Sequence, residues 1–435
     1  MNYKETLDYL YKRTPAYHNI GALAYKPGLE RSLALDEITG NPHKRFKSIH
    51  VAGTNGKGSV AHLLAAILQA SGYKVGLYTS PHLLDFSERI RINGRPITQQ
   101  YVIDFVGKNI KFIERENISF FEFTSAMAFD FFRHKKVNYA VIETGLGGKY
   151  DSTNIIKPLV SVITGISLEH TQLLGKTISE IAYEKAGIMK RNVPVVIGET
   201  HDDGLKQLFR SKAFEVSAPI IFSTQKETLL DAEMQANGSW IYDTIQYGLL
   251  AGELRGPAQK INSQTVLTTL KILANTGAQI RISAVRKAFK NVSQMTGLMG
   301  RWQELQSKPK VICDIGHNFG AWEINKRLLF YESGRHAKTH IIIGMSDDKD
   351  IDGMLSMMPD SATYYFTQAA NERAFPADEL AKRGESQGFN GQIYLSVEDA
   401  VKDALIKASP NDFVLISGSA FVVGEALRLF PDKHL

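Results

Sequence analysis

The sequence predicts an α/β protein of two domains, of which the N-terminal one is larger and has a mostly parallel sheet. Two observations lead to this prediction. Short apolar runs that end in glycine or polar residues alternate with segments of helical periodicity along most of the 435 residues. The alternation is interrupted at residues 291–300, which hold two glycines and few large side chains, and then starts again. We therefore expect an N-terminal domain over residues 1–295 and a C-terminal domain over residues 296–435.

Several segments of the N-terminal domain have residue patterns that predict helices. Residues 3–13 place two leucines on one side of a short helix. Thr98 and Thr177 are suitable N-caps, because a hydroxyl accepts a hydrogen bond from the free N–H groups of a first turn. The segment 120–132 is apolar almost all round, so we expect it to be buried. The expected helices span residues 3–13, 59–68, 98–117, 120–132, 177–190, 262–273 and 283–290.

Apolar runs of strand length separate these helices. In the N-terminal domain the expected strands span residues 49–52, 73–79, 137–142, 159–166 and 193–197. Residues 219–255 carry alternating patches around Trp240 and Tyr247, which indicate a small antiparallel sheet. After Arg301 the expected strands span residues 310–315, 339–344, 363–367, 392–395 and 412–417. Since helical segments separate these strands too, we expect a smaller, Rossmann-like parallel domain at the C-terminus.

The stretch from Lys47 to Val60 reads Lys-Ser-Ile-His-Val-Ala-Gly-Thr-Asn-Gly-Lys-Gly-Ser-Val. A strand, a Gly-rich turn and a helix N-terminus favour an anion, because backbone N–H groups, the helix dipole and Lys57 all attract it. Ser59 adds a hydroxyl within reach of a nucleotide-bound magnesium ion. The spacing departs from G-x-x-x-x-G-K-[ST], since Gly58 separates the lysine from the serine, and an ordinary βα turn is the alternative. The motif predicts a P-loop ATPase domain that binds a nucleoside triphosphate.

Polar residues gather where several expected strands end. Thr79-Ser-Pro-His-Leu83 follows one strand, and Glu143, with three glycines soon after it, ends another. Ligands bind at the carboxyl ends of strands in open α/β sheets, and a carboxylate there can hold magnesium. Residues 314–318 and 417–419 are the corresponding polar ends in the C-terminal domain. From its helical segment alone, we expect Lys185 to be a solvent-exposed charge on a helix.

Composition narrows the classes of function. The chain has 51 Lys and Arg against 45 Asp and Glu, and this net charge of +6 mildly favours anionic ligands. The basic residues are scattered, so we expect no nucleic-acid partner. The single cysteine, Cys313, excludes an intramolecular disulfide and fits a reducing compartment. Without a signal-peptide core or an apolar run near the roughly 20 residues of a membrane helix, we expect a cytoplasmic monomer with no membrane partner.

Taken in order, several stretches resemble the folylpolyglutamate synthase/dihydrofolate synthase family of the Mur ligase superfamily. Each could occur by chance, but their shared order along the whole chain makes chance a poor explanation. The stretches are Gly53-Thr-Asn-Gly-Lys-Gly-Ser59, Thr79-Ser-Pro-His-Leu83, Glu143-Thr-Gly-Leu-Gly-Gly148, Asp151-Ser-Thr-Asn154, Glu184-Lys-Ala-Gly-Ile188, Gly300-Arg-Trp302 and Asp314-Ile-Gly-His-Asn318. The resemblance implies an ATP-dependent amide ligase that joins L-glutamate to a folate or 7,8-dihydropteroate carboxyl. The route implied is an acyl phosphate, with release of ADP and phosphate.

The resemblance also implies roles for individual residues. The implied ATP-binding residues are Thr54, Asn55, Gly56, Lys57, Gly58, Ser59, Asn262, Arg301 and Asp314. Two magnesium sites are implied, with ligands Ser80, Glu143, His170 and a Lys185 carbamylated by CO₂. A carbamate replaces the lysine cation with a carboxylate-like oxygen donor, which suits a hard cation better than histidine does. The implied catalytic residues are Lys57, Lys185, Arg301 and His317.

Substrate roles are implied for residues from both domains. Those expected at the pterin pocket or at the glutamate site are Gly28, Leu29, Glu122, Tyr150, Asp151, Ser152, Ser417 and Ser419. His317 would place or deprotonate the incoming glutamate, with a purely structural histidine as the alternative. The loop Tyr25–Arg31 differs from the form associated with bifunctional members. A monofunctional folylpolyglutamate synthase therefore stays open beside a bifunctional enzyme.

Three other functions predict features that can be checked in the sequence. A Mur-type ligase for a cell-wall precursor predicts an extra UDP-binding domain before the phosphate-binding loop, which here begins near residue 50. A nucleotide-dependent switch without ligase chemistry predicts disruption of Glu143, His170 or Lys185, and all three are present. A nucleic-acid-binding protein predicts a basic patch, which the scattered charges do not supply.

Overall fold

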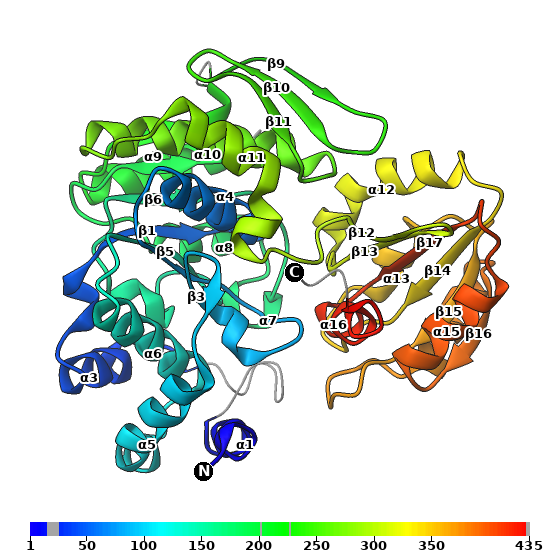
Figure 1. Ribbon diagram of the computed structural model, residues 1–435, viewed down its shortest axis with the longest axis horizontal. Coiled ribbons are helices and arrows are strands. Elements are labelled where there is room, and N and C mark those ends of the chain that lie inside the picture. The colour runs from blue at the N-terminus through cyan, green and yellow to red at the C-terminus, as the bar shows by residue number, and fades with distance from the viewer. Residues whose placement is uncertain (15–25, 201, 226–227, 432–435) are drawn as a thin grey trace.

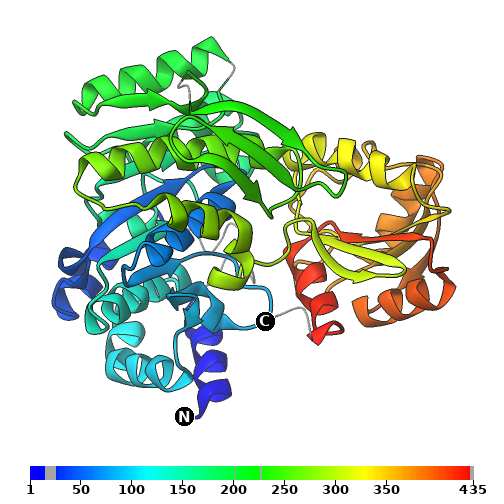
Figure 2. The ribbon, with the colours of Figure 1, turned by 45° about the horizontal axis from the view of Figure 1, so that its top comes forward.

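The computed structural model describes residues 1–14, 26–200, 202–225 and 228–431. Two α/β units lie side by side, the N-terminal one blue to green and the C-terminal one yellow to red (Figures 1 and 2). Each has its own sheet, and within the described residues the chain crosses from the first unit to the second once, between Thr296 and Gln303. The expected α/β class with parallel-rich sheets is confirmed.

An eight-stranded sheet forms the centre of the N-terminal unit, in the order β4-β3-β2-β5-β1-β6-β7-β8. Neighbours from β2 to β8 are parallel, whereas β3 pairs antiparallel with β2 and with β4. The strands are β1 (Lys47–Ala52), β2 (Val75–Tyr78), β3 (Ile90–Ile92), β4 (Arg95–Pro96), β5 (Tyr139–Glu143), β6 (Val160–Ile163), β7 (Val195–Ile197) and β8 (Ile220–Phe222). The β3–β4 hairpin was not predicted, because strands of two and three residues are too short to show a period.

Helices cover both faces of this sheet, and β1 shows why. Its side chains alternate in direction, so that Ile49 and Val51 pack in the core with α4, α10 and α11, while Ala52 packs with α8 and α9. The half of this second face near β2 and β5 is covered by α5 and α6. The helices of this unit are α1 (Tyr3–Arg13), α3 (Glu30–Ile38), α4 (Lys57–Ala70), α5 (Gln99–Glu116), α6 (Phe120–His134), α7 (Thr171–Leu174), α8 (Ile178–Ala186), α9 (Asp203–Glu215), α10 (Ala258–Asn275) and α11 (Ile282–Thr296).

Several helix predictions need correction. Helix α8 ends at Ala186 rather than Lys190, with Gly187 as its C-cap. Helix α11 continues to Thr296 with a kink at Asn291, whose φ of -140° and ψ of 30° are not helical, so residues 292–296 of the expected boundary segment are helical. Helices α3, α7 and α9 were not predicted. The loop Tyr25–Arg31 of the sequence analysis lies partly outside the described residues, and α3 already begins at Glu30.

The small antiparallel sheet expected within residues 219–255 is confirmed. Its strands are β9 (Leu229–Met234), β10 (Trp240–Thr244) and β11 (Gly248–Gly252), with β10 in the middle. Trp240, Tyr242 and Leu250 face inward and join the same core as α4 and α11. This sheet lies along one end of the N-terminal unit, beside α11 (Figures 1 and 2).

The C-terminal unit has a six-stranded sheet in the order β12-β13-β17-β14-β15-β16, parallel except for the unpredicted β12. Helices α12 to α14 pack on one face, and α15 and α16 pack on the other. The elements are β12 (Gln303–Ser307), β13 (Lys310–Asp314), α12 (Phe319–Ser333), β14 (Thr339–Ile343), α13 (Ile351–Leu355), β15 (Thr363–Thr367), α14 (Ala377–Ser386), β16 (Asn390–Tyr394), α15 (Val397–Lys407), β17 (Phe413–Ser417) and α16 (Ala420–Leu427).

Helix α16 packs closely against the N-terminal unit. A Cβ on Gly424 would lie 2.4 Å from the Leu83 carbonyl oxygen, so only glycine fits this contact. The carboxyl ends of β13, β14, β15 and β17 carry the loops of the second unit that approach the first. None of the helices in the described residues has the length and apolar character needed to span a bilayer.

Candidate active site

The phosphate-binding loop has the strand–turn–helix form that the sequence predicts. Strand β1 ends at Ala52, and α4 begins at Lys57. Gly53 and Gly56 have φ angles of 147° and 90°, which L side chains rarely adopt. A Cβ on Gly53 would lie 1.9 Å from Thr164 Oγ1, so β6 approaches the loop as closely as a glycine allows. The loop is therefore held open at the N-terminus of α4.

Two lysines converge on this loop. Lys57 Nζ donates to the carbonyls of Gly53 and Thr54, at 3.0 and 3.1 Å, and Lys185 Nζ donates to the same Gly53 carbonyl at 2.8 Å. Lys185 is only 2% exposed, so its interpretation as a solvated helix charge is wrong. Burial, together with the nearby charge of Lys57, lowers the pKa of Lys185 to about 7. The side chain can therefore exist as a neutral amine near neutral pH.

Glu143 and Ser80 meet at the carboxyl ends of β5 and β2. The backbone N–H of Ser80 donates to Glu143 Oε2 at 3.3 Å. Burial raises the pKa of Glu143, and the charges of Lys57 and Arg301 oppose this rise. Among the described residues there is no cluster of three or more His, Cys, Asp or Glu side chains that could hold a metal ion. A divalent cation held by Glu143 and Ser80 could take further oxygen ligands from a bound nucleotide, which is how magnesium is commonly held.

Asp151 fixes the glycine-rich turn that follows Glu143. Its Oδ2 accepts from the N–H groups of Gly145 and Leu146, both at 2.9 Å, and its Oδ1 accepts from the N–H of Thr153 at 3.0 Å. The carboxylate lines the pocket described next, but its oxygens are already occupied by the chain itself. Asp151 therefore shapes the turn, whatever else it contacts.

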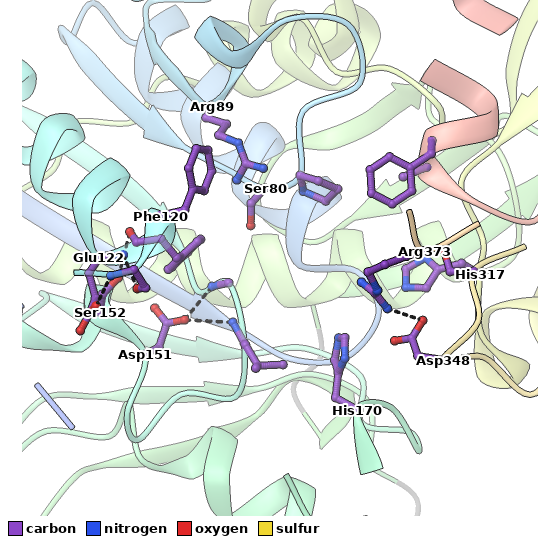
Figure 3. Close-up of a pocket in the computed structure, with 18 of the residues that line it drawn as sticks. Ser80, Arg89, Phe120, Glu122, Asp151, Ser152, His170, His317, Asp348 and Arg373 are labelled. Atoms are coloured by element: carbon purple, nitrogen blue, oxygen red, sulfur yellow. Dashed lines mark hydrogen bonds and ion pairs between the residues drawn. The ribbon is translucent and has the colours of Figure 1, made fainter. Parts of the chain in front are cut away.

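A cavity of about 250 Å³ lies between the two units, beside the phosphate-binding loop. Figure 3 shows Phe120, Glu122 and Ser152 at one end and His317, Asp348 and Arg373 at the other, with Ser80 and His170 between them. We call this cavity the substrate pocket; its lining also includes Lys26, Pro81, Arg89, Ser119, Phe121, Gly145, Leu146, Tyr150, Asp151, Ser346, Lys349, Ser419, Ala420 and Phe421. The end formed by the N-terminal unit, which we call the aromatic end, combines Phe120, Phe121 and Tyr150 with charged side chains, and the end formed by the C-terminal unit, which we call the charged end, includes Asp348, Lys349 and Arg373.

Glu122 stands at the aromatic end and has two partners. Its Oε2 accepts from the Ser119 N–H at 2.8 Å in a capping box, and its Oε1 accepts from Arg31 Nε at 2.9 Å. Arg31 belongs to the first turn of α3, next to Leu29, the N-cap of that helix. Gly28 and Leu29 are near this end in the chain but do not line the pocket.

Two contacts join the units beside the pocket. His317 Nε2 lies 2.9 Å from Glu169 Oε1, and His317 Nδ1 lies 3.0 Å from the Ile315 carbonyl. Both neighbours are hydrogen-bond acceptors, so the ring satisfies both when each nitrogen carries a proton. Burial lowers the pKa of the adjacent His170 to about 3, although Glu169 acts in the other direction. The second contact, between Asn55 and Asn318, is reciprocal at 3.2 and 3.1 Å.

Arg301, Asn262 and Asp314 flank the phosphate-binding loop. A Cβ on Gly56 would lie 2.4 Å from Asn262 Oδ1, and one on Gly58 would lie 3.2 Å from Arg301 Nη2. Asp314 accepts hydrogen bonds from the N–H groups of Trp302 and Gly316, each at 2.8 Å, and from Asn325. These three side chains therefore come from α10, from the crossing segment and from β13 to surround one loop.

The two candidate serines of the C-terminal unit differ in position. Ser419 lines the substrate pocket as the N-cap of α16. Ser417 is fully buried and donates to the Asp314 carbonyl at 2.6 Å, so it does not line the pocket.

Four residues at or beside the pocket were not predicted from the sequence, namely Glu169, Asp348, Lys349 and Arg373. The strand-end rule would have found the loop of Asp348 and Lys349, which follows β14.

The chain matches the models of two protein families. Residues 51–240 match the Mur ligase middle domain, and residues 300–420 match the Mur ligase glutamate ligase domain. The folylpolyglutamate synthase of Lacticaseibacillus casei is 31% identical over 434 residues, which is 97% of each chain. The dihydrofolate synthase/folylpolyglutamate synthase of Bacillus subtilis (strain 168) is 31% identical over 92% of this chain and 94% of its own.

Solved structures agree with these relatives. The Mycobacterium tuberculosis folylpolyglutamate synthase complexed with ADP has a TM-score of 0.86 at 29% identity, covering 98% of each chain. E. coli FolC in complex with DHPP and ADP has a TM-score of 0.84 at 27% identity, covering 100% of this chain and 99% of its own. The Yersinia pestis bifunctional enzyme complexed with AMPPNP and Mn ion has a TM-score of 0.82 at 29% identity, with 99% and 98% covered. The chain belongs to the folylpolyglutamate synthase/dihydrofolate synthase family of the Mur ligases.

Proposed function

We propose that this protein is an ADP-forming ligase that joins the amine of L-glutamate to the carboxyl of a folate, and also to that of 7,8-dihydropteroate. One observation carries the proposal. The substrate pocket extends to Ser80, whose N–H donates to the buried Glu143, and these two residues line a smaller cavity together with Gly58 of the phosphate-binding loop. A carboxyl group at the end of a long substrate can therefore meet the terminal phosphate of a nucleotide held by the loop.

The loop residues Thr54 to Ser59 would hold the ATP phosphates, with Arg301 towards the terminal phosphate and with Asn262 and Asp314 around the rest of the nucleotide. The resemblance to relatives solved with ADP, AMPPNP and Mn ion supports a nucleotide and a divalent cation. A bound cation neutralises phosphate charge and orients the transferring group. Ser80 and Glu143 are suitable oxygen donors for it, since a site of this kind needs only one or two protein ligands besides the phosphates.

Lys185 is the residue for which we propose carbamylation. The neutral amine is the form that attacks CO₂, and a pKa of about 7 makes that form available at neutral pH. The product would place a carboxylate-like group beside Lys57 and His170, where the structure holds a buried lysine. We propose that this group and His170 complete a second cation site next to Glu143.

The chemistry requires an activated carboxyl, because a carboxylate is a poor electrophile until one oxygen becomes a leaving group. Transfer of the terminal phosphate of ATP to that oxygen gives an acyl phosphate, which the amine of glutamate then attacks. Lys57 and Arg301 lie where they can offset the charge of the transferring group. His317, held by Glu169 and the Ile315 carbonyl, is proposed to place the glutamate.

The two ends of the pocket suit the two organic substrates. The pterin ring fits the aromatic end, near Phe120, Tyr150 and Ser152, with Glu122 as an acceptor for ring N–H groups. The charged end, with Lys349 and Arg373, suits the carboxylates of glutamate, and Ser419 caps the helix that faces them. We propose that the enzyme works as a monomer in the cytoplasm, with these small molecules and no nucleic acid as partners.

The test is glutamate-dependent release of ADP in the presence of magnesium. Tetrahydrofolate and 7,8-dihydropteroate are offered separately, and the products are weighed by mass spectrometry. We expect a mass increase of one glutamate residue from both substrates, and no ADP release above background when glutamate is omitted. Product from tetrahydrofolate alone would make the enzyme monofunctional. Failure with both, while ATP still binds, would overturn the folate proposal.

A further inference from the structure

A small cavity lies behind the phosphate-binding loop, on the side away from the substrate pocket. We call it the rear cavity; its lining includes Gly58, Ser80, Glu143, Arg91 and Arg301. Ser80 and Pro81 line both the substrate pocket and the rear cavity, so only this short segment separates them. The rear cavity thus touches the place where the terminal phosphate of ATP is proposed to react.

A second space continues from the rear cavity. This outer cavity, of about 450 Å³, is bounded by the β3–β4 hairpin, α11 and β12. Arg91, Arg301 and residues 297–299 line both spaces. The two guanidinium groups and the crossing segment therefore form the shared wall between the phosphate-binding loop and the outer cavity.

The two arginines of this wall retain hydrogen-bonding capacity. Arg91 donates to the carbonyls of Glu88 and Gly94, both at 3.2 Å, and Arg301 donates to the Gly300 carbonyl at 3.4 Å. Neither forms an ion pair with a carboxylate in the part of the chain that the structure describes. Each guanidinium has five N–H donors, so several are left for a ligand. Arg91 is only 7% exposed, and burial lowers its pKa, so little water is available to compensate the charge of this side chain.

The acidic groups along the same path are already satisfied. Four carboxylates line the two cavities. Glu88 accepts from the N–H groups of residues 83–85 at 2.9 Å, and Glu304 pairs with Arg255 at 2.8 Å. Glu143 accepts from the Ser80 N–H, and Glu253 accepts from the Ser293 N–H. His62, whose Nδ1 lies 2.8 Å from Thr296 Oγ1, is kept neutral because burial lowers its pKa to about 3. The path therefore offers two arginines with unused donors, while each of its carboxylates already has a hydrogen-bond or ion-pair partner, and unused guanidinium donors are what a small oxyanion binds.

We infer that Arg91 and Arg301 form a binding site for the inorganic phosphate that the reaction releases, and that phosphate leaves through the rear and outer cavities. The inference rests on the proposed function, because it needs an ADP-forming reaction. When the amide has formed, its product still fills the substrate pocket and ADP still occupies the loop. A route behind Gly58 lets phosphate leave without waiting for either.

The crossing segment is suited to act as a gate on this route. Gly297 and Gly300 have φ angles of 72° and 68°, and a Cβ on Gly297 would lie 2.6 Å from Arg91 Nη1. The segment thus rests directly on the arginine, and a change in its backbone dihedral angles moves the wall between the two cavities.

Binding is tested with the full-length enzyme saturated with magnesium and ADP, titrated with inorganic phosphate in a calorimeter. We expect Arg91→Met to weaken phosphate binding at least about tenfold, because hydrogen bonds to a charged partner are strong. Arg91→Lys keeps the charge with fewer donors and should fall between. Arg95→Met, an exposed arginine on the same hairpin, is the matched control and should bind as the unaltered enzyme does. Equal binding by Arg91→Met would overturn the site.

The exit route is tested by timing. Quenched-flow measurement gives the rate of phosphate formation, and a fluorescent phosphate sensor gives the rate of its release. We expect Arg91→Met to lower the ratio of release to formation several-fold, and Arg95→Met to leave it unchanged. Equal slowing of both steps would place the effect of Arg91 in the chemistry and refute the route. If no folate or dihydropteroate is extended, the proposed function fails, while the phosphate titration still decides the site.

Discussion

Asn55 and Asn318 exchange two hydrogen bonds across the boundary between the units, at 3.2 and 3.1 Å. The first residue belongs to the phosphate-binding loop, and the second is the N-cap of α12. Each amide thus donates to and accepts from the other. The pair therefore joins the phosphate-binding loop of one unit directly to the start of α12 in the other.

Substitution of Asn318 should therefore open the enzyme. Asn318→Ser keeps an N-cap hydroxyl but cannot reach Asn55, whereas Asn318→Ala also loses the cap, which costs about 1 kcal/mol. We expect both variants to lower kcat about tenfold, and only Asn318→Ala to lower the free energy of unfolding clearly. Small-angle scattering should give a larger radius of gyration for both in the presence of ADP. A serine variant with unchanged kcat and radius would contradict this expectation.

Lys185 should be a destabilising residue in the ligand-free protein. Its pKa falls to about 7 on folding, from an ordinary value of about 10.4, so the unfolded chain binds the proton more tightly. The free energy of unfolding should accordingly rise as the pH increases from about 7 to about 10. Lys185→Met should remove this contribution, raise stability at pH 7 and abolish amide formation. Urea unfolding at pH 7 and pH 9 measures the effect, with exposed Lys176→Met as the control.

Acid should weaken the fold through two buried histidines. Burial lowers the pKa values of His50 and His62 to about 3, against an ordinary value of about 6.5. Below about pH 6.5 these two histidines bind protons in the unfolded chain but not in the folded chain. The free energy of unfolding therefore falls as the pH drops towards 3. His62→Asn, which retains an amide near Thr296, should reduce the slope of stability against pH between 5 and 7. An unchanged slope would exclude His62 as a source.

The substitution Asp151→Asn tests whether this residue stabilises the turn after Glu143 in addition to lining the substrate pocket. The amide of asparagine presents one acceptor oxygen where the carboxylate accepts from Gly145, Leu146 and Thr153. We expect a loss of about 1–3 kcal/mol in the free energy of unfolding, because buried N–H groups lose partners. Turnover should also fall, since the same turn follows Glu143. Loss of turnover at full stability would instead favour direct contact with the substrate.

The part of the site that lies within one stretch of chain could be predicted from sequence. The strand, the glycine turn and Lys57 are neighbours along the chain, so the local sequence pattern is enough to predict the strand–turn–helix form of the phosphate-binding loop. Lys185 is different, because its burial depends on how α8 packs against the loop, and its helix alone gives no sign of that. Only the family resemblance singled it out.

The residues that were missed are brought in by packing over long distances in the sequence. Arg373 and Lys349 reach the pocket because the second unit docks against the first, and no period in their own segments records that contact. Ser417 illustrates a different limit. Two serines two positions apart share a face of a strand, but β17 ends at Ser417, and Gly418, with a φ of 101°, turns the chain before Ser419. That turn directs only Ser419 into the pocket.

The single crossing of the chain between the units has a consequence for how the enzyme could be divided. An intact crossing keeps each docking surface at a high effective concentration relative to the other, so closure is independent of the amount of protein. A cut between Met299 and Gly300 would turn the same closure into a bimolecular association. Activity of the nicked enzyme would then depend on its dilution, and the steepness of that dependence would report the intrinsic affinity of one unit for the other.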